Sequence, residues 1–182
     1  MAQGKKFLNS KEVKIRKIST TDLKRVEKFR EYINSLIKEE AKILLNTKRS
    51  LKEEKEWLKS SLEEMEKHQK IVLVAEDKDK VVGISELKLQ SEREKHIAGF
   101  GISIRAGYRG AGLGTRLMGE ILKLAKKELK PTPKIIRLSV FANNKIATNL
   151  YEKMGFKKVA RIPKQLVYKG KLIDEVVMLL EL

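Results

Sequence analysis

The sequence predicts an α+β protein with α/β/α layers, in which a central twisted, mixed and largely antiparallel sheet of six to seven strands is flanked by about four helices. Three observations support this fold class. Apolar residues recur at three- and four-residue spacing in some segments and at every second position in others. The two kinds of segment follow in the order β, α, α, β, β, β, α, β, α, β, β, which suits a sheet covered on both faces. The 182 residues contain no Pro/Gly/Ser-rich linker, which indicates one domain.

The first third of the chain predicts one strand followed by two helices. Residues 13–18 alternate apolar and charged side chains, as a half-buried strand does. Residues 20–22 then offer an N-cap for a helix whose apolar stripe covers residues 23–37. A second helix is expected to begin near Ser50, with carboxylates in its first turn and an apolar side that reaches Met65.

The rest of the chain alternates predicted strands with two helices. The first two strands form a hairpin around a turn at residues 77–80. One helix covers residues 113–129 and ends before Pro131, and another follows Asn144. The predicted strands of this part are residues 71–76, 81–89, 97–104, 135–140, 157–162 and 172–180.

The composition argues against several classes of protein. Without cysteine there is no disulfide, thiolate metal site or cysteine nucleophile, and two histidines leave little for a metal cluster, so no metal is expected. No apolar run approaches the roughly 20 residues of a membrane span. Residues 1–10, expected to be a flexible tail before a single domain at 11–182, lack the apolar segment of a secretory signal. We therefore expect a cytoplasmic protein without a membrane partner.

The chain is strongly basic, with 41 Lys and Arg against 24 Asp and Glu, a formal charge of +17. Residues 92–182 carry 19 basic and 8 acidic side chains and are the more basic half. Such a field attracts a phosphate-bearing ligand. A Lys/Glu-rich surface is also typical of heat-adapted proteins, and we favour this explanation for most of the lysines. With 5% aromatic residues and no recognisable reader motif, nucleic acid is not expected as the main partner.

A glycine-rich loop precedes the helix at residues 113–129. Arg109 is followed by Gly110, Gly112 and Gly114, at the point where a helix begins. The first helical turn leaves N–H groups without intrahelical partners, and glycines let a diphosphate approach them closely. A Rossmann fingerprint would need a glycine at Thr115, and a P-loop would need Gly-Lys-Ser/Thr. The pattern that remains is Arg-x-x-Gly-x-Gly.

This pattern resembles motif A of the GNAT superfamily of acetyl-CoA-dependent N-acetyltransferases. Residues 144–156 read NKIATNLYEKMGF and are similar to motif B of the same family, Asn-x-x-Ala-x-x-Leu-Tyr followed by Gly-Phe. The two motifs occur in the family's order and on the expected strand-helix-strand-helix frame. Residues 95–104 and 174–178 look most like the branch that holds amino-acid, polyamine and ribosomal-protein-alanine acetyltransferases. The resemblance implies the GNAT (acyl-CoA N-acyltransferase) fold over nearly the whole chain, with acetyl-CoA as co-substrate.

The resemblance also implies which residues bind the coenzyme. In the family, the strand before motif A binds the pantetheine arm through backbone groups, and the motif A loop holds the diphosphate mainly through N–H groups. Asn144 matches the motif B asparagine that contacts the pantetheine arm, although it is equally suited to cap the next helix. The implied coenzyme-binding residues are Ile102, Ser103, Ile104, Arg109, Gly110, Ala111, Gly112, Leu113, Gly114, Thr115 and Asn144.

The catalytic residues follow less directly. Tyr151 falls on the family tyrosine that donates a proton to the leaving thiolate, with plain core packing as the alternative. The base that deprotonates the amine is not identified by a motif. Glu86 is the first candidate, followed by His96 and Glu175, and each also suits a solvated surface position.

The sequence thus predicts an N-acetyltransferase that moves the acetyl group of acetyl-CoA to a primary amine of a small molecule or protein, by direct attack in a ternary complex. The alternative keeps the fold without the reaction: a non-catalytic acyl-CoA-binding module, or one associated with the ribosome or with nucleic acid. A monomer or a homodimer is expected in either case.

Overall fold

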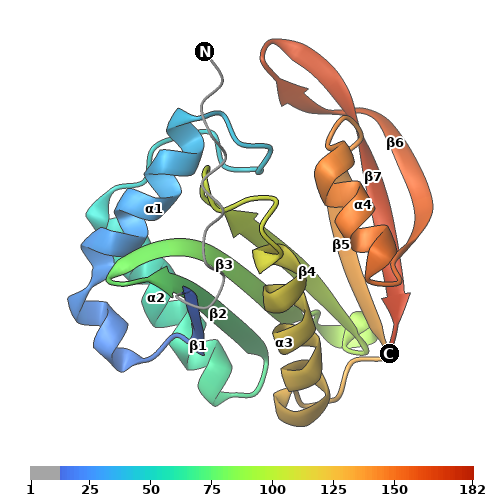
Figure 1. Ribbon diagram of the computed structural model, residues 1–182. Helices are drawn as coiled ribbons and strands as arrows, with labels where there is room; N and C mark the ends of the chain where they lie inside the picture. The colour runs from blue at the N-terminus through green and yellow to red at the C-terminus, as the bar shows by residue number, and fades with distance from the viewer. Residues whose placement is uncertain (1–12) are drawn as a thin grey trace.

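The computed structural model describes residues 13–182, so the tail expected at residues 1–10 lies outside the described part. The described residues form four α-helices and seven strands that belong to one sheet (Figure 1). The α+β fold class expected from the sequence is therefore confirmed. The elements are β1 (Val13–Lys17), η1 (Thr20–Lys24), α1 (Val26–Lys38), α2 (Leu51–Glu66), β2 (Lys70–Asp77), β3 (Lys80–Leu89), η2 (Glu92–Glu94), β4 (Ile97–Ile104), α3 (Leu113–Glu128), β5 (Ile135–Phe141), α4 (Lys145–Lys153), β6 (Lys157–Tyr168) and β7 (Lys171–Glu181).

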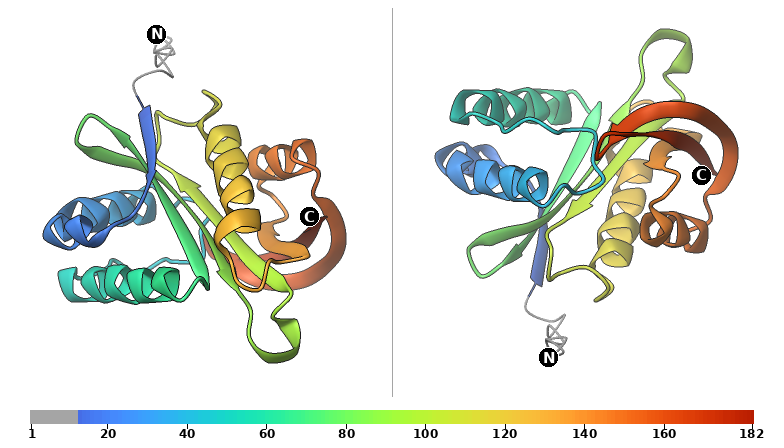
Figure 2. Two further views of the ribbon diagram at one scale, coloured as in Figure 1. Left: turned by 90° about the horizontal axis from the view of Figure 1, so that it is seen from below. Right: turned by 90° about the horizontal axis from the view of Figure 1, so that it is seen from above.

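The sheet separates two hydrophobic cores. Figure 2 shows α1 and α2 on one side of the sheet and α3 and α4 on the other. Strand β2 serves both sides because successive side chains point to opposite faces. Its Val72 packs with Phe29 of α1 and Leu58 of α2, whereas its Leu73 belongs to the larger core that includes Leu117 of α3. The strand order is β1-β2-β3-β4-β5-β7-β6.

Strands β4 and β5 are paired over a short distance only. Their parallel pairing joins Ile97–Gly99 to Ile135–Arg137, while the other five pairings in the described part of the chain are antiparallel. Beyond Gly99, β4 continues to Ile104 with β3 as its partner, and β5 continues to Phe141 with β7. The two strands diverge towards the top of Figure 1. From Phe100 onward, the side of β4 towards β5 therefore has no strand partner.

The first helix begins later than the sequence suggested. Residues 20–24 form the short 3-10 helix η1, and α1 starts at Val26. The cause is Asp22, whose carboxylate accepts hydrogen bonds from the Ser19 N–H (2.9 Å) and from both terminal nitrogens of Arg16 in β1 (2.7 and 2.8 Å). These bonds hold the turn against the sheet and separate it from α1.

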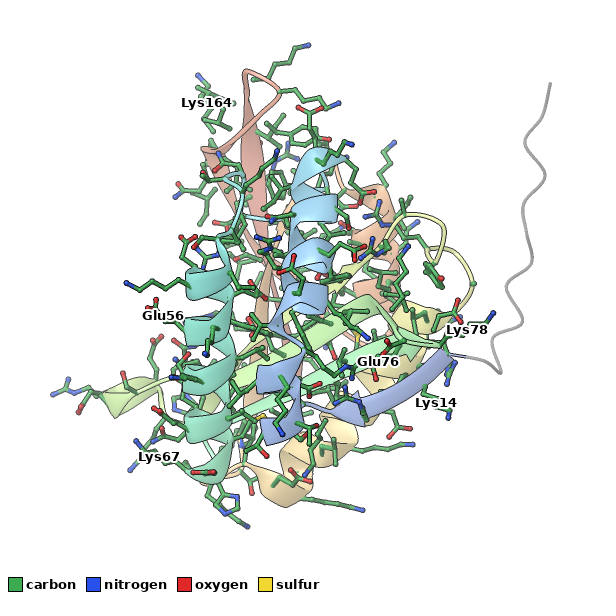
Figure 3. All side chains as sticks on the ribbon, turned by 90° about the vertical axis from the view of Figure 1, so that its left-hand side faces the viewer. Lys14, Glu56, Lys67, Glu76, Lys78 and Lys164 are labelled. Carbon is green, nitrogen blue, oxygen red and sulfur yellow. The ribbon has the colours of Figure 1, made fainter. Side chains whose placement is uncertain are left out.

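A charge cluster connects this turn to β2. We call Arg16, Asp22, Arg25, Glu76 and Asp79 the Arg16 cluster. Glu76, labelled in Figure 3, accepts hydrogen bonds from Arg16 (2.8 Å) and Arg25 (2.7 Å), and Asp79 accepts one from Arg25 (2.8 Å). Burial by itself would raise the pKa of Asp22 and of Glu76. The hydrogen bonds and positive charges of the arginines, together with the Ser19 N–H at Asp22, outweigh burial and hold both pKa values below their ordinary range.

The last hairpin is longer than predicted. Strand β6 runs to Tyr168 rather than to residue 162, and a turn at residues 169–170 joins it to β7. A register shift between Ile162 and Leu166 lets the strand continue past Pro163, and the Lys164 N–H donates to the Asp174 carboxylate (2.9 Å) in place of a ladder bond. A proline is tolerated here because β6 is the edge strand.

Candidate active site

The glycine-rich loop ends at the N-terminus of α3. Gly110 and Gly112 have φ angles of +78° and +79°, and Gly112 is the N-cap of the helix. Apart from the adjacent residues, a Cβ at either position would meet no atom of the described part of the chain within 4 Å. The first turn of α3 contains no acidic residue, and no side chain of residues 13–182 caps it. The N–H groups of Leu113, Gly114 and Thr115 therefore lack intrahelical partners and are available to an anion.

Gly114 has a different role in the loop. A Cβ there would lie 2.9 Å from a methyl group of Leu150 in α4 and 3.4 Å from one of Ile104, so this glycine allows α4 to approach the start of α3. The Leu113 side chain is buried in the larger core, while Ala111 is exposed. The loop therefore presents mainly backbone, rather than side chains, at the helix N-terminus.

Side chains of the loop fix it to neighbouring elements. The Nε of Arg109 donates to the Ile104 carbonyl (2.7 Å), and its guanidinium also pairs with Glu39 at the end of α1. The Tyr108 hydroxyl donates to Asp77 at the end of β2 (2.7 Å). In this structure the Arg109 guanidinium, which the sequence places at a phosphate, is thus bound by protein groups.

The three residues expected to bind the pantetheine arm lie on the unpartnered part of β4. Ile102 and Ile104 pack against the larger core. The Ser103 side chain points to the opposite face, where a hydrogen bond of 2.9 Å joins its hydroxyl to that of Tyr32 in α1. Tyr32 is fully buried, and burial raises its pKa. The side chains of residues 102–104 thus make contacts within the protein, and the backbone of this part of β4 is not paired on the side towards β5.

Asn144 begins α4 and caps it. Its side-chain oxygen accepts a hydrogen bond from the Ala147 N–H (3.4 Å). The capping role that the sequence left open is therefore present in the structure. The position of Asn144, directly after the connection from β5, places it at the end of the sheet where β4 and β5 are apart.

Tyr151 lies beside the point where β4 and β5 separate. Its ring packs edge-on against Phe100, with 6.3 Å between centroids, and near Phe156, with 6.0 Å. Phe100 is the first β4 residue beyond the last β4–β5 pair. Tyr151 is 7% exposed, and its hydroxyl makes no hydrogen bond within residues 13–182. Burial raises the pKa of Tyr151 to about 12, so it is a protonated phenol at neutral pH.

The three candidate bases lie in different places. Glu86 of β3 is opposite Gly101 of β4, two positions beyond the last β4–β5 pair. Glu175 of β7 is opposite Phe141, at the far end of β5 where the strands are apart. His96 precedes β4 at the other end, where β4 and β5 are paired. The structure thus brings Glu86 near the separation point and leaves His96 away from it.

Residues 13–182 contain no group of three His, Asp or Glu that could hold a metal.

Connections between elements, which the sequence did not indicate, meet near the same end of the sheet. The Tyr168 hydroxyl of the β6–β7 hairpin donates to the Glu40 carbonyl after α1 (3.0 Å), and Lys169 pairs with the Glu40 carboxylate (2.8 Å). Lys42 donates to the carbonyl of Asn143 before α4 (2.7 Å). In Figure 1 the α1–α2 connection and the hairpin tip both lie towards the top. Two of these contacts use backbone carbonyls, which leave no signal in the sequence.

Several solved structures share this fold. An acetyltransferase of the GNAT family from Streptococcus pneumoniae has a TM-score of 0.81 at 23% identity, covering 94% of this chain and 99% of the other. Ribosomal-protein-alanine N-acetyltransferase from Brucella melitensis has a TM-score of 0.79 at 21% identity, covering 93% and 99%. The Salmonella typhimurium protein yncA, solved with its cofactor acetyl-CoA, has a TM-score of 0.78 at 19% identity, covering 93% and 94%. At these identities the likeness shows the fold.

The sequence itself identifies the family. The sequence model of the Acetyltransferase (GNAT) family matches residues 33–156, so the chain belongs to this family. A curated relative, L-amino acid N-acetyltransferase AaaT of Escherichia coli (strain K12), is 30% identical over 85 residues. The aligned region is 47% of this chain and 51% of AaaT, so the match spans about half the length of that relative. No helix among residues 13–182 is long and apolar enough to span a membrane.

Proposed function

We propose that this protein transfers the acetyl group of acetyl-CoA to a primary amine of a small molecule or a protein, by direct attack in a ternary complex. The observation that carries the proposal is the unpartnered segment of β4, which leads from the free N–H groups of α3 to the Tyr151 hydroxyl. Membership of the GNAT family, the similarity to AaaT and the yncA structure with acetyl-CoA support it.

The residues present fit acetyl-CoA, which would supply a thioester activated for acyl transfer. The N–H groups of residues 110–115 hold its diphosphate, because the open space at Gly110 and Gly112 lets phosphate oxygens come within hydrogen-bonding range. The backbone of residues 102–104 pairs with the pantetheine arm in the manner of a neighbouring strand. Asn144 contacts the same arm from the start of α4. The side chains at positions 111 and 113 matter little to this binding.

Two side chains move protons in the proposed reaction. A primary amine has a pKa of about 10 and is protonated at neutral pH, so a base must remove a proton before attack. Glu86 is that base. As the amine nitrogen bonds to the carbonyl carbon, the carbon–sulfur bond breaks, and the sulfur takes a proton from Tyr151. The second proton that the nitrogen loses as it becomes an amide passes by way of solvent to the Tyr151 phenolate and restores the phenol. The phenol suits this step because its O–H is not committed to another group of residues 13–182.

Two measurements on the purified protein test the proposal. Calorimetric titration with acetyl-CoA should show binding, and free thiol should be released from acetyl-CoA in the presence of at least one member of a panel of L-amino acids, polyamines and peptides with free N-termini. Binding without thiol release would instead favour a non-catalytic acyl-CoA-binding module. The absence of both would contradict the proposal. Sedimentation in the same buffer would distinguish between the two expected states, a monomer and a homodimer.

Replacing Gly112 with Ala should weaken acetyl-CoA binding about tenfold or more. A side chain at φ +79° costs about 1–2 kcal/mol, and the new Cβ occupies the space through which the diphosphate approaches. Gly170→Ala is a matched control, because Gly170 has φ +72° and open space around it but lies in the β6–β7 turn. Both variants should lose similar thermal stability, and only Gly112→Ala should lose affinity in calorimetry. If the two variants bound acetyl-CoA with equal affinity, this would argue against binding of the diphosphate at this loop.

A further inference from the structure

Lys70, at the start of β2, is a lysine buried between α2 and the sheet. It is 7% exposed. Its Nζ donates to the Ser61 hydroxyl (3.0 Å) and lies 5.6 Å from the centre of the Trp57 ring, and both of these residues belong to α2. An ammonium group withdrawn from water needs such partners, since desolvation of a charge is costly. The two contacts fix Nζ at one place beneath α2.

Glu86 provides the negative charge that faces this ammonium. Its Oε2 lies 3.0 Å from the Lys70 Nζ. The same oxygen is buried and accepts no hydrogen bond within the described part of the chain, so the ion pair is what compensates its burial. Glu64 is a weaker partner of Lys70, at 3.9 Å, and its carboxylate is bound by the exposed Lys88. The Lys70–Glu86 pair is therefore the principal charge contact at this place.

The second oxygen of Glu86 is directed towards β4. Oε1 lies 3.6 Å from the position that a Cβ on Gly101 would occupy. Gly101 is opposite Glu86 in the strand register, and it belongs to the part of β4 that has no partner in β5. The Glu86 side chain as a whole is 39% exposed. One oxygen is thus anchored by a buried cation, and the other borders the unpartnered strand without an intervening side chain.

We propose that Lys70 is a positioning residue, which holds the Glu86 carboxylate so that Oε1 faces the acceptor amine. The proposal rests on the proposed function, in which Glu86 is the base. The proton of the amine passes to Oε1, while Lys70 keeps its own protons and fixes Oε2. A glutamate without an anchor would sample several rotamers, and small displacements of a catalytic group reduce rates strongly. Loss of the partner that orients a metal ligand typically costs about 10- to 100-fold, and we expect a similar factor for the partner of a catalytic carboxylate.

A double-mutant cycle in the full chain tests this role, with the fastest amine of the panel as acceptor. Lys70→Met should lower kcat about tenfold and Glu86→Gln about a hundredfold, with the KM for acetyl-CoA unchanged. Added to Glu86→Gln, Lys70→Met should change kcat by less than about twofold, because no carboxylate remains to be positioned. Lys88→Met is the matched control: it lies on the same face of β3, two residues from Glu86, and should resemble the wild type.

Thermal unfolding and calorimetric affinity for acetyl-CoA give readouts that are independent of turnover. If Lys70→Met does not fold, Lys70→Gln replaces it, since an amide still donates to Ser61 but carries no charge. The positioning role would be overturned if Lys70→Met lowered kcat by the same factor in the wild type and in Glu86→Gln. It would also be overturned if Glu86→Gln had the kcat of the wild type. Equal rates for Lys70→Met and Lys88→Met would overturn this role alone. A wild-type protein that acetylates no amine would overturn the proposed function as well.

Discussion

Tyr151→Phe should lower kcat by about two to three orders of magnitude, the range expected when a general acid is removed. The departing thiolate would then take its proton from solvent, to which this buried site gives little access. Affinity for acetyl-CoA should stay within about twofold of the wild type, because in the proposed complex the hydroxyl serves the reacting sulfur and not the diphosphate. Steady-state thiol release gives kcat, and calorimetry gives the affinity.

The same substitution should leave stability nearly unchanged, which separates catalysis from packing. The ring keeps its contacts with Phe100 and Phe156, and the lost hydroxyl has no hydrogen-bond partner within residues 13–182. Burial raises the pKa of Tyr151 to about 12, so the proton needed for donation is present throughout pH 7–10. Deprotonation of Tyr151 should therefore not lower the turnover of the wild type within this pH range. Unaltered kcat in Tyr151→Phe would reject its role as the acid.

Asp22→Ala should have the largest effect on stability, about 3 kcal/mol, because it removes the fully buried one of the two carboxylates that bind Arg16 and leaves Glu76 alone to compensate that charge. For a domain of this size the melting temperature should fall by about 6–12 °C. Asp22 is fully buried, and its loss also removes the bond to the Ser19 N–H that holds η1 against β1. Urea unfolding at pH 7 measures the change in the free energy of unfolding.

Asp79→Ala is the matched control for Asp22→Ala. Asp79 belongs to the same Arg16 cluster but its side chain is 76% exposed, so its removal should cost less than about 1 kcal/mol. The pKa values of Asp22 and Glu76 are depressed in the folded state, so their contribution is present above the ordinary values of 3.8 and 4.5 and is lost as the pH falls below them. The free energy of unfolding of Asp22→Ala should therefore fall less steeply with decreasing pH than that of the wild type. Equal costs for the two variants would contradict this account.

Local signals in the sequence were sufficient for the order of the elements. The strand predicted at residues 97–104 has those bounds in the structure, and Ser50 caps α2 through a reciprocal bond with Glu53, as the acidic first turn suggested. Both features depend on residues within a few positions of each other. The start predicted for α1 and the end predicted for β6 were wrong because a neighbouring strand binds the chain there: Arg16 of β1 binds Asp22, and Asp174 of β7 accepts from the Lys164 N–H.

The candidate site was predictable where it consists of one contiguous stretch of chain and less so where side chains from different elements meet. The glycine loop and the Asn144 cap follow from a contiguous stretch of sequence. The pairing of Arg109 with Glu39, and of Lys70 with Glu86, joins residues from elements that only the folded sheet brings together. Gly114 shows a further limit: the sequence groups it with Gly110 and Gly112, but its contact is with Leu150 of another helix. The roles of the individual site residues stay predictions.

Strands β4 and β5 are paired at three positions only, so the sheet consists of two halves that are joined over a short distance. One half contains β1 to β4 and the other β5 to β7, and α3 provides the covalent crossing between them. Few hydrogen bonds join the two halves there, and an extended pantetheine arm lying along β4 would add hydrogen bonds to the unpaired side of that strand. Amide hydrogen exchange at residues 100–104 should therefore slow when acetyl-CoA is added, while exchange in α2 stays the same. Coenzyme binding would then set the width of the opening that the acceptor enters.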